Sequence, residues 1–464
     1  MKQCSAEGSN IRIAAVTLLL GSLLSAAVGS AKADEIDDFL QAQMRVRKIP
    51  GLQVAVVQDN TLIKFASYGL ANLQDSVSVS DQTVFTINSM TKSFAGVAIM
   101  QLVEQGKLTL SDTVGQHLDD LPASWANVTV KQLLTHTSGL PDISGKGVYV
   151  ISLKDADTAW QTLLTQPLDF EAGSEFRYNQ TNYVLLGKII DKTSGMRFVD
   201  FIVQRQLRPV SMTKTEAAGF AHFQDVIPHQ ARGYTYQLTG SLTTVYSEFP
   251  PYLRASAGMS ASADELARWV IALNTGELLQ HSASVAALWT PGALADGKSV
   301  GFDRFLNGYA LGWQVIDRPE HRAIASVGGN RAAIMIYPDD DLAIVVLTNL
   351  MGASPERFID EIAGFYLDDM QSINGLRLSE AELRPLLGEY DFGGFSITVS
   401  LEGNALSMLA SGAGQEAFAV YARSNDEFFA KVIEASFLFE RDAQGKANGL
   451  IFQQGETERL GRKL

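Results

Sequence analysis

Cysteine is almost absent from this sequence. The 464 residues include one cysteine, Cys4, close to the N-terminus. If the leader described below is removed, the mature chain has no thiol, which excludes disulfides, a cysteine nucleophile and cysteine-ligated zinc. The six histidines form no His-Glu-x-x-His motif and no close pair, so we expect no metal centre. The chemistry left to the chain is that of serine, histidine, carboxylate, lysine or tyrosine.

Positive charge and proline are also scarce. The chain has 37 Lys plus Arg against 51 Asp plus Glu, and its net charge of −14 argues against a nucleic-acid partner. With 46% hydrophobic residues and 13 prolines, the composition is that of a globular protein with a large core. The length exceeds what one core usually supports, so we expect a large domain and a smaller one.

Long hydrophobic runs are limited to one stretch near the N-terminus. Residues 13–27 carry no charge, Lys2 and Arg12 precede them, and Ala31-Lys32-Ala33 has the small-x-small form of a cleavage site. This pattern predicts a signal peptide over residues 1–33, cleaved after Ala33, and an exported protein, periplasmic or secreted. A membrane anchor is the alternative, but the run is short for a bilayer and no second hydrophobic span follows it.

The mature chain shows strand patterns at both ends of a helical middle. We expect a helix over Glu35–Arg47 and mostly helical structure with long loops over residues 93–279. We expect a further helix over Pro355–Leu367. The expected strands are Leu52–Gln58, Leu62–Tyr68, Leu311–Ile316, Ala323–Val327, Ala332–Tyr337 and Leu342–Thr348. This order predicts an α/β fold in which one sheet is assembled from both ends of the domain, with the helical region inserted between them.

After about residue 376 the pattern changes to short strands separated by Gly, Asn and Asp turns. The expected strands there are Phe395–Leu401, Ala405–Leu409, Ala417–Tyr421, Glu427–Val432 and Ser436–Glu440. We therefore predict three parts: a signal peptide over 1–33, a large domain over 34–371 and a small all-β domain over 378–464.

One motif matches a nucleotide-binding loop by its letters. Residues 292–299, Gly-Ala-Leu-Ala-Asp-Gly-Lys-Ser, fit the Walker A pattern. A phosphate loop needs a strand before it and a helix after it, whereas a helix-like stretch precedes this segment. Asp296 would also repel phosphates. We interpret the match as chance.

The strongest chemical signal is Ser89-Met-Thr-Lys92. Residues three apart on a helix share a face, so Lys92 would stand beside Ser89 in the first turn. Residues 94–103, which follow and are nearly all apolar, predict a buried helix. Burial would lower the pKa of Lys92 and let it take the proton of the Ser89 hydroxyl. The alternative for Ser89 is a helix N-cap beside a lysine that reaches to the surface.

The same four residues occur again as Ser211-Met-Thr-Lys214. They precede the mixed stretch 215–225, in which we expect no buried helix. We predict a structural or surface role for this second copy.

Four segments give the chain a resemblance to the serine β-lactamase-related family over residues 35–369. They are Phe85-Thr-Ile-Asn-Ser89-Met-Thr-Lys92, Gln132-Leu-Leu-Thr-His136-Thr-Ser-Gly-Leu140, Tyr178-Asn-Gln-Thr-Asn-Tyr183-Val-Leu-Leu-Gly187 and Tyr309-Ala-Leu-Gly-Trp313. The family includes class C β-lactamases, D-alanyl-D-alanine carboxypeptidases, D-aminopeptidases and esterases. The resemblance implies a β-lactamase/transpeptidase-like α/β fold without metal or organic cofactor. The tail loosely resembles β-rich modules appended to some members.

The resemblance implies Ser89 as the acylated nucleophile, Lys92 as its proton partner and Tyr178 as a general acid or base. A phenol near a lysine ammonium is more easily ionised, which supports the role of Tyr178, although a core tyrosine is the alternative. Gln180 stands where the family has Asn and keeps an amide for substrate contact, one methylene further out.

The strand that flanks the site departs further from the family. It reads Ser326-Val-Gly328-Gly329, where the family has Lys-x-Gly or His-x-Gly. Gly328 and Gly329 suit close approach of a substrate, and the backbone N–H of Gly329 is expected to join that of Ser89 as an oxyanion donor. Ser326 can hydrogen-bond a substrate but carries no charge. Arg331 is close by, although strand alternation points it to the other face. We expect a mainly structural role for His136.

The sequence therefore predicts an exported serine hydrolase that forms an acyl-enzyme on Ser89 and hydrolyses an ester or amide of a small molecule or peptide. A β-lactamase or a D-amino-acid-specific peptidase is an alternative. A non-catalytic binding or scaffold protein that keeps the fold is an alternative of another class. The sequence leaves the physiological substrate, the oligomeric state and the purpose of the tail open.

Overall fold

The structure, a computed structural model, describes residues 35–464 apart from several short internal segments. Those segments are 145–155, 221–224, 237–240, 246–249, 304, 368–369, 371–377, 403–404, 412–416, 423, 431–434, 443–444 and 455–456. The predicted signal peptide over residues 1–33 lies outside the described residues. Among the described residues, no helix combines the length and the apolar character needed to cross a bilayer.

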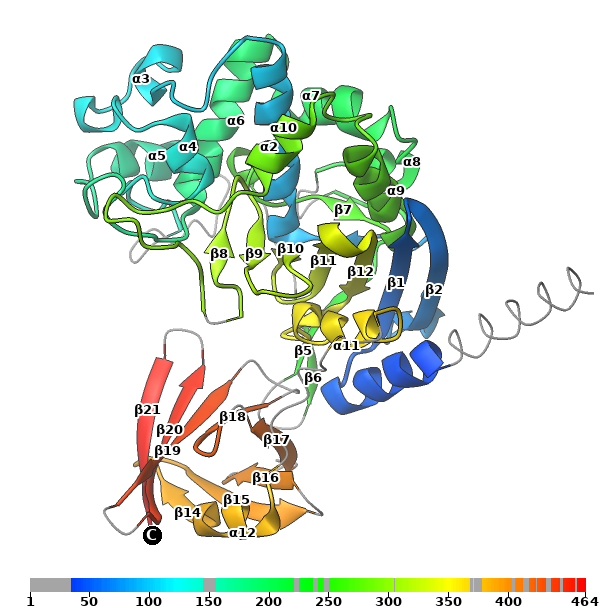
Figure 1. Cartoon of the computed structure of the whole chain (residues 1–464), viewed down its shortest axis with the longest axis vertical. Coiled ribbons are helices and arrows are strands. Elements are labelled where there is room, and N and C mark those ends of the chain that lie inside the picture. The colour runs from blue at the N-terminus through cyan, green and yellow to red at the C-terminus, as the bar shows by residue number, and fades with distance from the viewer. Residues whose placement is uncertain are drawn as a thin grey trace, which may run out of the picture.

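One antiparallel sheet forms the centre of the large domain (Figure 1). Within the described chain its eight strands run in the order β3-β2-β1-β12-β11-β10-β9-β8. Leu52 of β1 pairs with Thr348 of β12, so strands from both ends of the domain are neighbours, as predicted. The strands are β1 (Gly51–Gln58), β2 (Thr61–Asn72), β3 (Val77–Ser78), β8 (Gly308–Tyr309), β9 (Gln314–Ile316), β10 (Ala323–Gly328), β11 (Ala332–Tyr337) and β12 (Leu342–Thr348).

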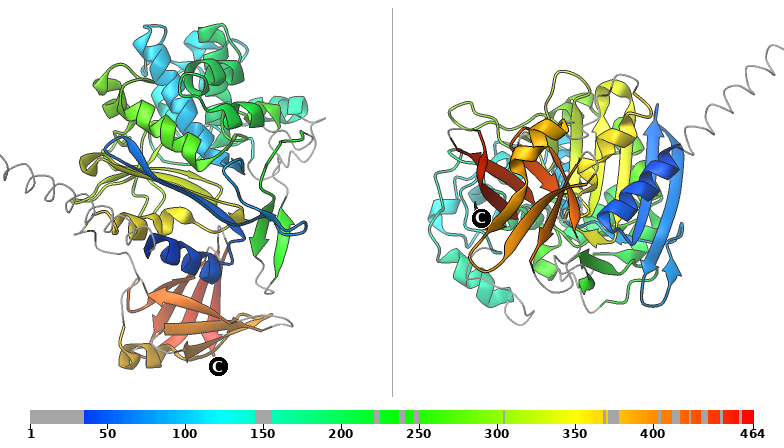
Figure 2. Two further views of the ribbon diagram at one scale, coloured as in Figure 1. Left: turned by 90° about the vertical axis from the view of Figure 1, so that its right-hand side faces the viewer. Right: turned by 90° about the horizontal axis from the view of Figure 1, so that it is seen from below.

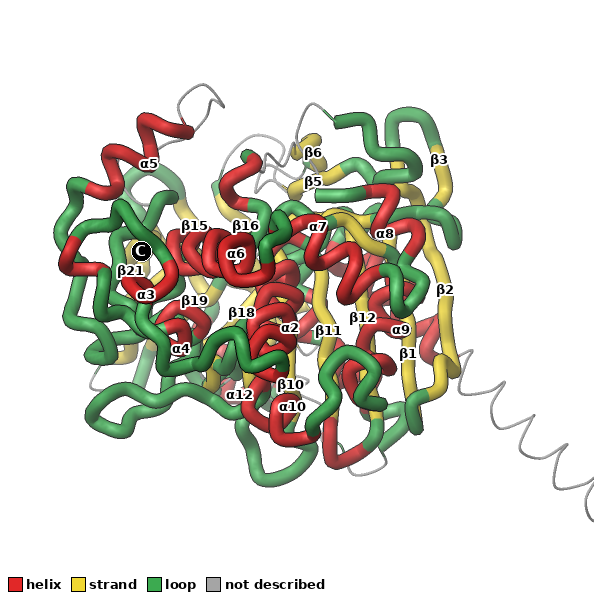
Figure 3. Tube along the Cα trace, turned by 90° about the horizontal axis from the view of Figure 1, so that it is seen from above, coloured by secondary structure: helices red, strands yellow, loops and turns green. Residues whose placement is uncertain are grey.

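Helices cover both faces of this sheet, which explains why its central strands are apolar along their whole length. Figure 2 shows a thick helical layer on one face, and the helix of residues 35–47 with α11 (Ile359–Ala363) on the other. Seen from above, α2 lies at the middle of the thick layer (Figure 3). That layer contains α2 (Thr91–Glu104), α3 (Val114–His117), α4 (Val130–Leu134), α5 (Ala156–Leu164), α6 (Gln180–Ser194), α7 (Phe198–Ile202), α8 (Thr213–Ala218), α9 (Ala263–Asn274) and α10 (Ser282–Leu288).

Two strongly periodic segments differ from the sequence expectation. The strand expected over 311–316 begins only at Gln314, because the chain turns at Gly312 with φ +89°. A Cβ on Gly312 would lie 2.6 Å from the Lys92 carbonyl oxygen, so this turn packs directly on α2. The helix expected over 355–367 is a 3₁₀ turn (Pro355–Arg357) followed by α11, because Phe358, at φ −130°, interrupts the helical backbone.

The helical region between the two halves of the sheet also contains strands and a helix that we did not expect. These strands are β4 (Phe85–Thr86), β5 (Gly233–Tyr236), β6 (Leu242–Val245) and β7 (Ser260–Ala261). Among the described residues, β5 and β6 form a small sheet with β13 (Leu350–Met351), which pairs with β5. The expectation of no buried helix after Ser211 was wrong in part: α8 follows it, and Thr215 and Ala218 of α8 are buried because α8 packs on β7 and bonds through Thr215 to Glu265 of α9.

The tail forms an all-β domain, as predicted, and its described strands close into a barrel. These strands are β14 (Gly388–Asp391), β15 (Ser396–Glu402), β16 (Ala405–Ala410), β17 (Phe418–Ala422), β18 (Glu427–Ala430), β19 (Ser436–Arg441), β20 (Ala447–Gln454) and β21 (Thr457–Lys463). The short helix α12 (Glu380–Leu383) precedes them. Sequence patterns missed β14, β20 and β21. The limits predicted for the two domains, 34–371 and 378–464, stay predictions.

The barrel lies against the side of the large domain that carries the helix of residues 35–47 (Figures 1 and 2). Tyr421 of β17 is within electrostatic reach of Arg47 in that helix and of Glu361 in α11. Residues of the two parts therefore meet on the face of the sheet opposite to α2.

Candidate active site

Ser89 and Lys92 lie at the start of the buried helix α2, as their spacing predicts. Ser89 belongs to a 3₁₀ turn, η1 (Asn88–Met90), which leads into α2, and Asn88 makes the entry possible with a left-handed backbone at φ +47°. Ser89 is partly exposed, whereas Lys92 is 1% exposed. The hydroxyl can therefore meet a substrate while the amine stays out of water.

The amine of Lys92 has three close oxygen neighbours. Its Nζ lies 3.2 Å from Ser89 Oγ, 2.9 Å from Gln180 Oε1 and 2.9 Å from the Ser256 carbonyl oxygen. Burial lowers the pKa of Lys92 to about 7, and the nearby Asp142 carboxylate opposes this shift. A neutral amine has two hydrogens and one lone pair. Because the amide and carbonyl oxygens can only accept, they take the two hydrogens and leave the lone pair for the Ser89 hydroxyl proton.

Tyr178 lies over the same pair of residues. Lys92 Nζ is 4.7 Å from the centroid of its ring, and its hydroxyl hydrogen-bonds with the side chains of Ser89 and Gln180. We expected a lysine ammonium to make this phenol easier to ionise, and the structure corrects that expectation. Burial raises the pKa of Tyr178, and the neighbouring lysine, with a pKa of about 7, carries its positive charge only part of the time at neutral pH. Tyr178 is therefore a phenol that can donate a proton.

Gln180 takes part in the lysine contacts despite its extra methylene. It is the first residue of α6, after the N-cap Asn179, whose side chain accepts a hydrogen bond from the Asn182 N–H. The Gln180 backbone N–H donates to Asp142 at 3.0 Å. The carboxylate thus holds the start of α6 beside Lys92. Asp142 was missed in the sequence, where its place two residues after the end of the His136 motif was the available signal.

The end of β10 lies directly against the turn that carries Ser89. A Cβ on Gly328 would stand 1.8 Å from the Ile87 carbonyl oxygen, and one on Gly329 would stand 1.8 Å from Asn88 Nδ2. Gly329 also has φ +57°, which a side chain would strain. Only glycines allow this approach. Gly329 and Ser89 thus lie on segments that touch each other. The role of their N–H groups as oxyanion donors stays a prediction.

Ser326 and Arg331 bring no cation to this end of β10. Ser326 is 1% exposed and its Oγ lies 2.7 Å from Ser93 Oγ, whose hydroxyl donates to the Gly312 carbonyl. The Ser326 hydroxyl is therefore turned to α2 rather than to a substrate. Arg331 is buried beside Gly233 of β5, as strand alternation indicated, and burial lowers its pKa to about 10. The expected substrate contact of Ser326 has no geometric support.

His136 supports the segment that carries Tyr178. Its buried ring stands 4.4 Å from the Tyr178 ring, and its Nδ1 accepts a hydrogen bond from the Asn179 backbone N–H. Its Nε2 lies 3.2 Å from the Tyr309 hydroxyl. Burial lowers the pKa of His136 well below its usual value, so the ring is neutral. Because Nδ1 accepts from Asn179, the ring hydrogen belongs on Nε2, which donates to the Tyr309 hydroxyl oxygen. These contacts agree with the structural role expected from the sequence.

The loop that fits the Walker A letters has no phosphate-loop geometry. It follows α10 and precedes β8, so neither the strand before it nor the helix after it is present. The same loop also carries the letters Gly-x-Ser-x-Gly over residues 297–301, and Ser299 there is exposed and outside any strand-to-helix turn. Lys298 pairs with Asp296 at 2.7 Å on the surface. Among the described residues, no group of histidine, cysteine and carboxylate side chains could hold a metal ion.

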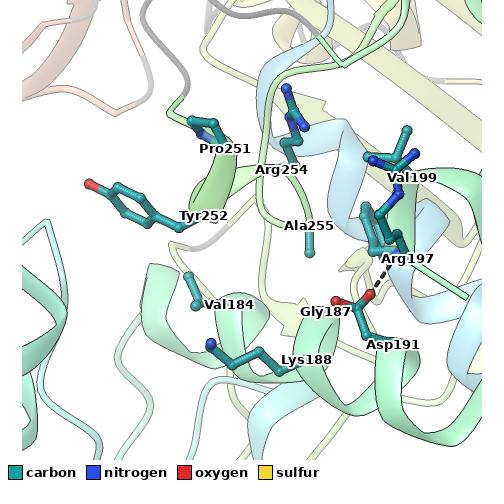
Figure 4. A pocket seen from close by; sticks show the side chains of 11 residues that line it. Val184, Gly187, Lys188, Asp191, Arg197, Val199, Pro251, Tyr252, Arg254 and Ala255 are labelled. Carbon is teal, nitrogen blue, oxygen red and sulfur yellow. Dashed lines mark hydrogen bonds between the residues drawn. The ribbon is translucent and has the colours of Figure 1, made fainter. Parts of the chain in front are cut away.

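A cavity of about 340 Å³ lies beside α6, away from these residues. Figure 4 shows Val184 and Lys188 of α6 on one side and Tyr252 and Ala255 on the other. Tyr252 belongs to the 3₁₀ turn η5 (Pro251–Leu253). Neither the nucleophile nor its lysine lines this cavity, although Ala255 directly precedes Ser256, whose carbonyl accepts from Lys92.

Comparison with protein-family models agrees with this geometry. The model of the Beta-lactamase family matches residues 36–367, and the chain belongs to this family. Its members are generally serine hydrolases, and the fold is the β-lactamase/transpeptidase-like α/β fold predicted from the motifs.

Known proteins resemble the chain at two levels. Protein flp of Staphylococcus aureus strain N315 is 28% identical over 343 residues, which are 71% of this chain and 65% of flp, so the chain spans about two thirds of that relative. The octameric penicillin-binding protein homologue from Pyrococcus abyssi has a TM-score of 0.66 at 22% identity and covers 93% of this chain and 100% of its own. A class C beta-lactamase has a TM-score of 0.60 at 23% identity, covering 74% and 97%. These two structures share the fold.

Proposed function

We propose that this protein is a serine hydrolase that forms an acyl-enzyme on Ser89 and hydrolyses an ester or amide. The observation that carries the proposal is the set of contacts around Lys92. A buried amine with a pKa of about 7 lies 3.2 Å from a partly exposed serine hydroxyl, and two acceptors occupy its hydrogens. This arrangement suits removal of a serine proton at neutral pH.

The acylation step follows from the roles of three side chains. Ser89 Oγ attacks the substrate carbonyl carbon while its proton passes to Lys92, and the carbonyl oxygen becomes an oxyanion. The N–H groups of Ser89 and Gly329 are the proposed donors to that oxyanion. The Tyr178 phenol donates its proton to the leaving group, and the proton on Lys92 restores the phenol. The serine proton thus ends on the leaving alcohol or amine.

Hydrolysis of the acyl-enzyme uses the same groups in reverse. A water takes the place of the leaving group next to Tyr178 and loses a proton to the Tyr178–Lys92 pair as it attacks the ester carbonyl. Ser89 Oγ then leaves with that proton. Microscopic reversibility requires no additional residue for this step.

The substrate class follows from the residues around β10. Penicillins and D-alanyl peptides carry a carboxylate beside the scissile bond, and a charge-assisted hydrogen bond to it is worth about 1.5–3 kcal/mol. Ser326 is neutral and turned to Ser93, and Arg331 lies beside β5. We therefore propose uncharged esters or amides as substrates. A matched pair, free acid and methyl ester, should show higher kcat/KM for the methyl ester.

Covalent labelling tests the proposal directly. A fluorophosphonate should add to Ser89, as read by intact mass and peptide mapping, and Ser89→Ala should abolish the label. Ser211→Ala is the matched control because it replaces the corresponding serine of the second Ser-Met-Thr-Lys segment. An unlabelled wild-type protein would favour a non-catalytic scaffold. A strong preference for the free acid would favour a β-lactamase or a D-amino-acid-specific peptidase.

We also propose that the protein is exported after cleavage behind Ala33 and that the barrel supports the large domain rather than the chemistry. The electrostatic interaction of Tyr421 with Arg47, on the face of the sheet opposite to α2, supports the second statement. N-terminal sequencing of the protein from its native compartment tests the first. A chain ending at Gln371 should keep Ser89 labelling, and loss of labelling in a folded truncation would contradict the second.

A further inference from the structure

An exposed aromatic side chain stands beside the proposed proton donor. Phe302 lies in the loop before β8 and is 45% exposed. Every other aromatic side chain of the described residues is buried or half-buried. Its ring centroid is 5.2 Å from that of Tyr178 and 5.5 Å from that of Phe176. The three rings form a small aromatic wall, the Phe302 wall, which includes the ring of Tyr178.

The position of Phe302 is held by contacts within its loop and with the large domain. Its backbone N–H donates to the Leu306 carbonyl at 2.8 Å. The Asp303 carboxylate accepts from the N–H groups of Phe305 and Leu306 at 2.8 and 2.7 Å, and Arg357 pairs with the same carboxylate. The exposed ring is therefore preorganised, so little order has to be gained when a ligand covers it.

The chemistry of the site indicates what covers the ring. In the proposed function, on which this inference rests, Tyr178 protonates the leaving group, so the leaving oxygen or nitrogen lies at the Tyr178 hydroxyl. The Phe302 ring, which is exposed and 5.2 Å from the Tyr178 ring, is the apolar surface available to the atoms bonded to that oxygen or nitrogen. We infer that the Phe302 wall binds the leaving group and makes the enzyme selective for esters of apolar, and best of aromatic, alcohols.

Other groups near the wall do not favour a charged leaving group. Tyr309 and His136 lie behind it, at 5.8 Å from the Phe302 ring and 4.4 Å from the Tyr178 ring respectively, and both are buried and uncharged. An aromatic group against these rings gains burial and edge-to-face contacts that a polar chain of similar size does not.

The test compares two acetate esters whose alcohols have similar acidity but different polarity, benzyl acetate and 2-methoxyethyl acetate. The wild-type enzyme should show a higher kcat/KM for benzyl acetate. Phe302→Ala should lower the ratio of the two kcat/KM values by about five- to tenfold, as the loss of one aromatic contact predicts. Phe302→Trp should keep the preference.

Two matched controls separate a contact with substrate from a general change of the loop. Phe305→Ala alters the same loop, but its ring packs on Arg357 at 4.8 Å, away from Tyr178. Tyr252→Ala removes an aromatic side chain from the cavity beside α6. Neither should change the ratio. An unchanged ratio in Phe302→Ala, or an equal fall in either control, would overturn the inference.

The outcome for the wild type separates this inference from the proposed function. If Ser89 is labelled by a fluorophosphonate but the two acetates are hydrolysed equally well, or neither is hydrolysed, the selectivity is wrong and the serine hydrolase stands. If Ser89 is not labelled and neither ester is hydrolysed, the proposed function fails and the inference fails with it.

Discussion

The two Ser-Met-Thr-Lys segments have the same residues in different surroundings. In the first, Ser89 belongs to the 3₁₀ turn η1, which runs directly into the buried helix α2, and Lys92 Nζ lies 3.2 Å from Ser89 Oγ. In the second, Ser211 is exposed with φ +56°, and α8 begins only at Thr213. Each serine stands two residues before the α-helix of its lysine, but only Ser211 has a left-handed backbone, which breaks the helical path from the serine to the lysine.

The second lysine is also engaged elsewhere. Lys214 Nζ pairs with Asp264 at 2.7 Å, and its backbone N–H donates to the buried Glu265 at 2.8 Å. Glu265 also accepts from the N–H and the hydroxyl of Thr215. The second segment thus fixes the start of α8 to α9. The comparison teaches that helix phase and exclusion of water, rather than the four letters, make a nucleophile and its base.

The largest expected difference is between the two serines. Ser89→Ala should lower kcat/KM for an activated ester by at least about 10³-fold because it removes the nucleophile. Ser211→Ala should change it by less than about twofold, since substitutions at exposed positions are nearly neutral. Steady-state kinetics of both variants measure this. Substantial turnover by Ser89→Ala would contradict the assignment.

The effects on kcat/KM of replacing the two lysines should differ almost as much. Lys92→Met should lower kcat/KM by about 10²–10⁴-fold, the usual contribution of a positioned proton acceptor. Lys214→Met should leave kcat/KM unchanged and lower the free energy of unfolding by up to about 1 kcal/mol, through loss of its ion pair with Asp264. Kinetics and denaturant unfolding separate the two effects. Equal losses of activity would show that both lysines act through stability.

The pH dependence of kcat/KM should come from Lys92 in the first segment and not from Lys214 in the second. Lys92 must be neutral to accept a proton, and its pKa is about 7, so kcat/KM should fall about tenfold per pH unit below that value. Four titratable groups lie around its amine: Tyr178, Tyr183 and His136, which are uncharged, and Asp142.

Removing the charge of Asp142 should sharpen this result. The carboxylate favours protonated Lys92, so Asp142→Asn should lower the pKa of Lys92 and move the acidic limb of the kcat/KM profile to lower pH. Ser211→Ala should leave the limb in place. A shift of the limb to higher pH in Asp142→Asn would contradict the assignment of the limb to Lys92.

The smallest expected effect concerns the backbone of the two segments. Ser211 has a left-handed backbone, which glycine adopts more easily, so Ser211→Gly should raise the free energy of unfolding by about 0.5–1 kcal/mol without loss of activity. Asn88 has φ +47° at the first segment, but its side chain packs against Gly329. Asn88→Gly should therefore not raise the free energy of unfolding by a similar amount. Thermal unfolding of both variants checks this.

Sequence patterns predicted most of the central sheet and the nature of the tail. Strands β11 and β12 match their expected limits, Ala332–Tyr337 and Leu342–Thr348, because both faces of these strands are buried and their residues are apolar throughout. The weaker segments were missed. Strands β20 and β21 have exposed polar residues, and their place is decided by closure of the barrel rather than by their own pattern.

For the candidate site, the sequence by itself determined that Ser89 and Lys92 come together, but not that Asp142 and Ser256 join them. Ser89 and Lys92 are held by helix spacing, and Gly328 and Gly329 are the residues that can meet the turn before α2. Only the tertiary structure decided their chemical states. The pKa values of Lys92 and Tyr178, the contact of Ser326 with Ser93 and the exposure of Phe302 depend on neighbours distant in the chain. Desolvation and the field of nearby charges are properties of a packed environment, and no local pattern of residues encodes them.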